Sequence, residues 1–148
     1  MYKHILIATD GSELAGHAVT SGVTLAKSVG AKASIIVVEP SFNVFDVPES
    51  QVRQMSDAFA KHAEQIKKHA THVLDRAADT AKAAGVTCNK IQVEHDQPYE
   101  AIVKAAKDNG CDLIVMASHG RAGVSAVLLG SVTSKVLTHT KVPVLVVH

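Results

Sequence analysis

Short apolar runs of strand length alternate with longer segments of helical periodicity along this chain. The runs are Lys3–Ala8, Ala33–Val38, Lys90–His95, Asp112–Ala117 and Pro143–Val147. Between them, the spacing of apolar residues predicts helices over Ser12–Val29, Gln51–Ala84, Tyr99–Lys107 and Ser131–Thr138. Strands that are joined by helical crossovers pair in parallel. The alternation therefore predicts an α/β domain, a five-stranded parallel sheet with helices on both faces.

Composition limits the classes of protein to which this chain can belong. Its 148 residues suit one domain over 1–148, and a hydrophobic fraction of 47% is enough for a sizeable core. A net charge of +1, 3% aromatic residues and no Trp argue against a nucleic-acid partner. The first apolar run, Ile5–Ala8, is too short for a signal peptide or a membrane span. We expect a cytoplasmic protein without membrane contact, in which Cys88 and Cys111 stay free thiols.

The segment from Asp112 to His148 joins an apolar strand, a glycine-bearing loop, the start of a helix and a final strand. A helix N-terminus presents free backbone N–H groups and a partial positive charge, and it therefore attracts anions. A loop that delivers a phosphate to such a terminus needs small residues and hydroxyl groups. This segment supplies them as Gly120, Gly123, Gly130, Ser131, Thr133 and Ser134. The pattern indicates a phosphate-holding unit.

The spacing of the glycines indicates the type of loop. A Walker P-loop has a lysine between its last glycine and its serine or threonine, whereas Ser131 follows Gly130 directly. The dinucleotide fingerprint Gly-x-Gly-x-x-Gly is also absent. The pattern present is Ala117, two residues, Gly120, nine residues, and then Gly130-Ser131. It resembles the ATP-binding loop of the universal stress protein family, which has glycine at the position of Ala117.

The resemblance to universal stress proteins extends over the whole chain. HILIATDGSELAGHAV is similar to the family's first strand and Asp-Gly-Ser turn, IIVVEP to its second strand, and LLGSVTSKVLTHTKVPVLVV to its phosphate loop and last strand. The resemblance implies a Rossmann-like domain of strand order 3-2-1-4-5 that binds ATP with Mg²⁺. It also implies a homodimer through the last strand, Pro143–Val147, which would otherwise be an exposed apolar edge.

In that strand order, the sequence order reverses between the first and fourth strands, where open α/β sheets bind their ligands. Both strands lead into small or polar residues, Thr9-Asp10-Gly11-Ser12 after the first and Met116-Ala117-Ser118-His119-Gly120 at the end of the fourth. We expect the two loops to form one nucleotide site. The resemblance adds the backbone of Val38 as a contact for adenine. The loop and helix start add Arg121, Gly130, Ser131, Val132 and Thr133 as phosphate contacts.

These residues also have purely structural interpretations. Ser131 is suited to cap the last helix, and Asp10 to cap the first one, with Glu13 three residues later. The glycines are compatible with ordinary turns, Val38 with the core, and Arg121 with a solvated loop. As a ligand-binding group, Asp10 would meet a ribose hydroxyl or a phosphate-bound Mg²⁺.

Nine histidines raise the alternative of a protein metal site. His69 and His72 lie about one turn apart on the second predicted helix, but no further ligand of defined spacing accompanies them. A solvated helix face that includes His62 is expected instead. Since no nucleophile, base and orienting group can be identified, we expect no dedicated enzymatic activity. The chain is predicted to act in stress response or regulation by binding nucleotide, with a nucleotide-free dimerisation module and a slow ATP-hydrolysing enzyme as alternatives.

Overall fold

The computed structural model describes residues 1–41, 48–120 and 129–148. The chain forms the elements β1 His4–Ala8, α1 Glu13–Val29, β2 Lys32–Glu39, α2 Glu49–Ala83, β3 Cys88–Glu94, α3 Pro98–Asp108, β4 Leu113–Ala117, α4 Ser131–His139 and β5 Val144–Val147. Each predicted strand and helix is present, and the ends differ by a few residues.

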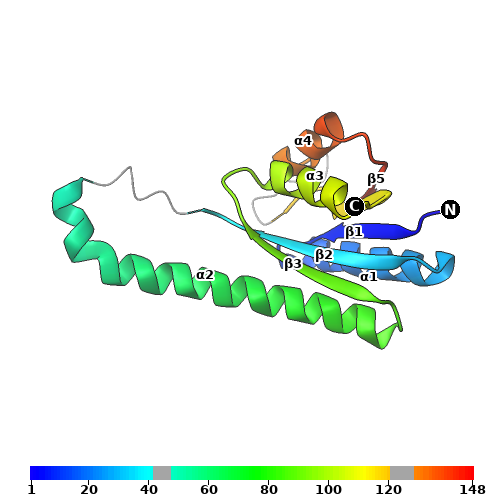
Figure 1. The fold of residues 1–148 in the computed structure, drawn as a ribbon, viewed down its shortest axis with the longest axis horizontal. Coiled ribbons are helices and arrows are strands. Elements are labelled where there is room, and N and C mark those ends of the chain that lie inside the picture. Colours follow the sequence, from blue (N-terminus) through cyan, green and yellow to red (C-terminus); the bar gives the residue numbers. More distant parts are fainter. Residues whose placement is uncertain (42–47, 121–128) are drawn as a thin grey trace.

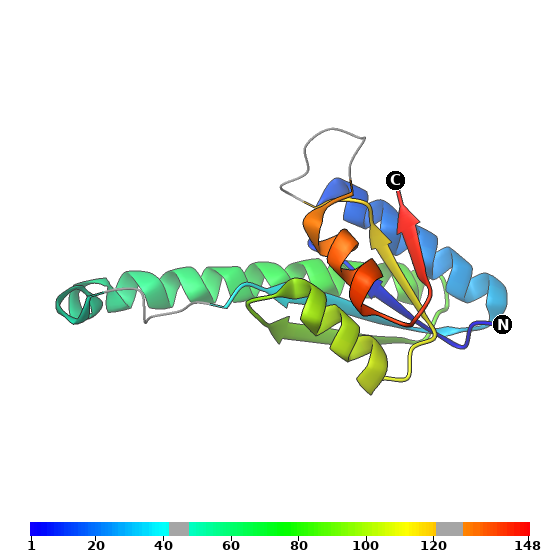
Figure 2. The same ribbon diagram turned by 90° about the horizontal axis from the view of Figure 1, so that it is seen from above.

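The five strands form one parallel sheet in the order β3-β2-β1-β4-β5. This confirms the predicted fold class and strand order. Figure 1 shows α3 and α4 above the sheet and α1 and α2 below it, and Figure 2 shows the same arrangement from above. Both edges of the sheet, β3 and β5, pair with one neighbour only.

Alternate residues of the strands supply the two cores of the domain. On β1, Ile5 and Ile7 face α1 and α2, whereas Leu6 faces α3 and α4. All three are completely buried, as expected for a sheet that is covered on both faces. Gly22 lets α1 lie close to the sheet, because a Cβ there would be 2.7 Å from Cδ1 of Ile7.

Helix α2 is much longer than the sheet that it covers (Figure 1). Its C-terminal half packs on β2 and β3 through Ala70, Leu74, Ala77 and Ala81. Residues 60–65 farther toward its N-terminus are exposed. The side chains of His62, His69 and His72 are exposed too, which agrees with the predicted solvated face.

Polar side chains close the end of the sheet where the strands begin. The ring of His4 is hydrogen-bonded on both sides, through Nε2 to Oγ of Ser34 at 2.8 Å and through Nδ1 to the Asn109 carbonyl at 3.0 Å. The carboxylate of Asp112 accepts the backbone N–H groups of Lys3 and His4. His4 and Ser34 are buried and Asp112 is half-buried. Because these groups are hydrogen-bonded within the fold, we interpret this end of the sheet as structural.

Two further expectations concern the cysteines and the membrane. Cys88 and Cys111 are both free thiols, as predicted. Cys88 is half-buried and Cys111 is buried. Within the described ranges, no helix is long and apolar enough to span a membrane.

Candidate functional site

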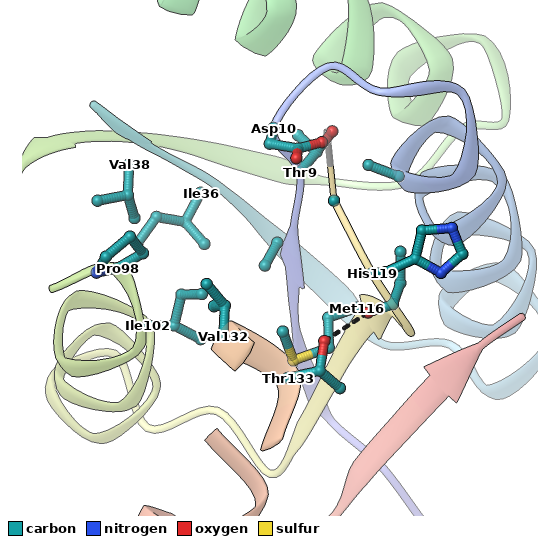
Figure 3. A pocket seen from close by; sticks show the side chains of 14 residues that line it. Thr9, Asp10, Ile36, Val38, Pro98, Ile102, Met116, His119, Val132 and Thr133 are labelled. Carbon is teal, nitrogen blue, oxygen red and sulfur yellow. Dashed lines mark hydrogen bonds between the residues drawn. The ribbon is translucent and has the colours of Figure 1, made fainter. Parts of the chain in front are cut away.

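A cavity of about 200 Å³ opens at the carboxyl ends of β1 and β4 (Figure 3). This is the point where the sequence order reverses in the sheet, as predicted. Its lining is formed by Ala8, Thr9, Asp10, Ala15, Ile36, Val38, Pro98, Ile102, Met116, Ala117, His119, Gly120, Val132 and Thr133. The cavity therefore brings together strand ends and the first turns of α1, α3 and α4.

The loop after β1 is fixed by short-range hydrogen bonds. Asp10 Oδ1 accepts the N–H of Ser12 at 2.9 Å, and Gly11 between them has φ 82°, which favours glycine. The hydroxyl of Ser12 then accepts the N–H of Ala15 and caps α1. The interpretation of Asp10 as the helix cap is therefore wrong, because the left-handed turn at Gly11 moves that role to Ser12. Asp10 is exposed at the cavity instead.

The end of β4 forms the opposite wall. Ala117 ends the strand in extended conformation, and none of the described non-glycine residues has positive φ. Its carbonyl accepts the hydroxyl of Thr133 at 2.8 Å, which ties α4 to the strand (Figure 3). Alanine thus fits the backbone at the position where the family pattern has glycine.

Two glycines allow the loops to approach closely. A Cβ on Gly120 would collide with Oδ2 of Asp10, so Gly120 lets the β4 loop meet the β1 loop across the cavity. A Cβ on Gly130 would lie 3.1 Å from Cα of His119 and 3.2 Å from the Ser118 carbonyl oxygen. Neither glycine has positive φ, so contact with neighbours, not backbone conformation, explains the residue type.

The start of α4 has the features of an anion site. Gly130 is the N-cap, and no side chain among the described residues caps this helix. The interpretation of Ser131 as the cap is therefore wrong, because Ser131 is the first helical residue and its side chain is exposed. Val132 and Thr133 follow it and line the cavity. The first N–H groups of a helix lack intrahelical acceptors, so this terminus can receive an anion.

The other side of the cavity is apolar. Figure 3 shows Ile36, Val38, Pro98, Ile102 and Val132 grouped together, away from His119. Of these, the sequence had indicated only Val38 and Val132. The remaining three gave no signal as site residues, because apolar side chains in a strand and a helix indicate a core.

The structure brings most of the predicted site residues to this cavity. Those that line it are Thr9, Asp10, Val38, Met116, Ala117, His119, Gly120, Val132 and Thr133. Gly11, Ser12, Ser118, Gly130 and Ser131 belong to the same loops without lining the cavity. Arg121 and Gly123 lie outside the described residues. The binding roles of all these residues stay predictions.

The titratable side chains at the cavity are few. Among the described residues, no group of three or more His, Cys, Asp or Glu side chains is placed to hold a metal ion. His119 lies half-buried at the cavity, and its Nδ1 is 3.2 Å from the hydroxyl of Ser118. The carboxylate of Asp10 is the acidic group at the cavity.

Sequence comparison decides the family. The model of the universal stress protein family matches residues 1–148. The chain belongs to this family. Universal stress protein YxiE of Bacillus subtilis is 31% identical to it over 156 aligned positions that cover both chains completely.

Solved structures of similar proteins share the fold. The structure of MJ0577 from Methanocaldococcus jannaschii has a TM-score of 0.77 at 29% identity, covering 99% of this chain and 96% of that one. The structure of a universal stress protein in complex with cAMP has a TM-score of 0.68 at 29% identity, covering 99% and 97% of the two chains. The predicted family is confirmed by both kinds of comparison.

Proposed function

We propose that this universal stress protein binds ATP with Mg²⁺ in the cavity between β1 and β4. One observation carries the proposal: the N-terminus of α4, which no side chain of the described residues caps, lies beside an apolar wall at the point where the strand order of the sheet reverses. A nucleotide has an apolar base at one end and anionic phosphates at the other. The cavity offers surroundings for both in one space.

The base is assigned to the apolar side and the phosphates to α4. Ile36, Val38 and Ile102 provide apolar contact area for a purine, and the backbone of Val38 is the proposed contact for its edge. The N–H groups of Ser131, Val132 and Thr133 are the proposed donors to the β- and γ-phosphates. The hydroxyl of Thr133 is not assigned to a phosphate, because it already donates its hydrogen to the Ala117 carbonyl.

Asp10 is the proposed neighbour of the ribose or of the metal ion. Its carboxylate is exposed at the cavity, where it lies against Gly120. A carboxylate near a triphosphate is favourable only with a hydroxyl donor or a cation between them. Mg²⁺ prefers such oxygen ligands together with phosphate oxygens, so the residues present fit this ion. The ion would reduce the repulsion between Asp10 and the phosphates.

The relatives support a nucleotide as the ligand. The solved universal stress protein with cAMP is 29% identical to this chain and matches it over nearly its whole length. We infer that residues 1–148 form one nucleotide-binding domain, which acts in the cytoplasm in stress response or regulation. Among the described residues that line the cavity, Asp10 and His119 are the ones that could activate a water near the γ-phosphate, and we assign neither of them a catalytic role.

The direct test is mass analysis of small molecules that are released when the purified protein is denatured. An adenine nucleotide in amounts near one per chain would support the proposal. Its absence, followed by a failure to load the protein with Mg-ATP, would make the nucleotide-free module the better account.

We further propose that the protein is a homodimer through β5. The two sheet edges differ: β3 carries Lys90, Gln92 and Glu94, whereas β5 is Val-Leu-Val-Val. Charged residues discourage pairing at a sheet edge, and an apolar edge invites it. Leu145 is 40% exposed on that edge. Pairing of two β5 strands across a two-fold axis would cover the open β5 edge of each protomer.

Val146 offers a selective test of the dimer. The carbonyls of Pro143 and Val147 accept the N–H groups of Ile114 in β4 and of Ser118 directly after it. By alternation, the N–H and carbonyl groups of Val144 and Val146 face the open edge. Val146→Pro removes one outward N–H and should shift the light-scattering mass toward monomer or aggregate. Val146→Thr keeps that N–H in a similar shape and should stay dimeric. If Val146→Pro remains a well-behaved dimer, the interface is elsewhere.

A further inference from the structure

The open strand and the cavity are linked by a chain of hydrogen bonds. Ser118 donates its N–H to the Val147 carbonyl of β5 at 2.8 Å, and its own carbonyl accepts the N–H of Gly130 at 2.7 Å. Gly130 is the N-cap of α4. The connection therefore runs from the end of β5, through a single residue, to the helix terminus at the cavity.

Ala117 provides a second connection between the same parts. It is paired with Val147 in the sheet, its side chain lines the cavity, and its carbonyl accepts the hydroxyl of Thr133. Ala117 and Thr133 are both buried, at 8% and 2% exposure. A hydrogen bond in such surroundings is costly to break. It therefore fixes the start of α4 against the end of β4, which is paired with β5.

The packing at these connections leaves little free space. At Gly130, the carbon atom of an added methyl group would lie only 3.1 Å from Cα of His119. Close-packed elements transmit a small displacement to their neighbours, since they cannot absorb it. A shift of the α4 terminus would therefore reach Ser118, and from there Val147.

We propose that nucleotide binding at the cavity and self-association through β5 are coupled, so that each strengthens the other. The inference rests on the proposed function, since it needs both the ligand and the dimer. Both events order the same peptide groups, at Ala117, Ser118 and Gly130. The event that occurs second therefore has less conformational entropy to lose. The coupling is reciprocal, so the same factor applies in both directions.

Sedimentation velocity over a range of protein concentrations tests the coupling on the intact chain. The dissociation constant of the dimer is measured without nucleotide and with saturating Mg-ATP. We expect Mg-ATP to lower it by about fivefold or more, the smaller end of common coupling factors. Hydrogen exchange of the Val146 and Val147 amides should slow on addition of Mg-ATP at a fixed fraction of dimer.

A pair of threonine variants on α4 locates the connection. Thr133→Val removes the buried hydroxyl that bonds to the Ala117 carbonyl, and it should reduce the effect of Mg-ATP on the dimer constant. Thr138→Val is the matched control, because that hydroxyl is exposed and bonds only within α4 among the described contacts. The control should keep the full effect.

The possible failures are distinguishable. If Mg-ATP does not bind at all, the proposed function is wrong and the coupling with it. If Mg-ATP binds but the dimer constant is unchanged, the coupling alone is overturned. If no dimer forms, the proposed homodimer is wrong and the coupling with it. Equal effects of Thr133→Val and Thr138→Val would also contradict the assigned connection.

Discussion

The two ends of the sheet use polar residues in opposite ways. Where the strands begin, the side chains of His4, Ser34 and Asp112 bond to one another or to nearby backbone. Where β1 and β4 end, the loops surround a cavity and the terminus of α4 has no side-chain cap among the described residues. The polar groups at the first end are hydrogen-bonded to one another or to backbone, whereas the start of α4 has N–H groups that no described side chain caps.

This difference leads to different expectations for the two ends of the sheet. Buried polar groups that are fully bonded hold elements in place. Free N–H groups at a helix terminus beside a cavity can stabilise a bound anion. Substitutions at the first end should therefore change the free energy of unfolding, and substitutions at the second should change nucleotide affinity.

The largest effect is expected from Gly130→Val at the cavity end. The branched side chain would meet the backbone of Ser118 and His119 and displace the start of α4. Mg-ATP affinity in equilibrium dialysis should fall by at least about 100-fold, roughly 2.8 kcal/mol. Gly16→Ala is the control, because a Cβ at Gly16 meets nothing within 4 Å, and it should bind as the parent does. If Gly130→Val binds Mg-ATP as well as the parent does, the start of α4 is not part of the nucleotide site.

A smaller effect, on stability alone, is expected from pH at the other end. Burial lowers the pKa of His4 from 6.5, assisted by the positive charge of Lys32 and opposed by the Asn109 carbonyl and Asp112. Below about pH 6.5, His4 is protonated in the unfolded chain but stays largely neutral in the folded protein until its lower folded pKa is reached. The stability due to neutral His4 is thus complete above pH 6.5 and declines as pH falls through the lower folded pKa.

Urea unfolding at pH 7.5 and pH 5.5 checks this sign. The midpoint should fall more between these pH values for the parent than for His4→Gln, which cannot titrate. Asp112 does not interfere, because burial raises its pKa less than the N–H groups of Lys3 and His4 lower it, and it stays ionised at both pH values. An equal fall in both proteins would show that His4 is not the group responsible.

The smallest effect is expected at Ala117, where the sequence departs from the family loop. Its backbone is extended, so glycine is not required for conformation. Ala117→Gly should change Mg-ATP affinity by less than about tenfold, roughly 1.4 kcal/mol, whereas Ala117→Val should weaken it by crowding the cavity. An Ala117→Gly variant that gains binding absent from the parent would instead make Ala117 an off switch.

The fold was predictable because each strand and helix has a strong local signal. Apolar runs predicted all five strands, and Gly30, with φ 71°, ends α1 as its position in the sequence indicates. The strand order came from the resemblance to a family, since periodicity does not reveal which strands are neighbours. The polar half of the cavity followed from that order, because it places the ends of β1 and β4 together.

The remaining features depend on contacts that the sequence does not display. Asp10 and Ser12 are both good helix caps, and only the turn at Gly11 decides between them. Pro98 and Ile102 reach the cavity because α3 packs across the end of β2, where Ile36 also lines the space. An apolar residue in a helix gives the same signal whether it faces a core or a ligand.

Titration calorimetry with Mg-ATP tests the central claim that the cavity at the carboxyl ends of β1 and β4 is a nucleotide site. The account predicts saturable binding of about one nucleotide per chain, lost in Gly130→Val and kept in Gly16→Ala. Heat that does not saturate, or no binding at millimolar Mg-ATP, would contradict it.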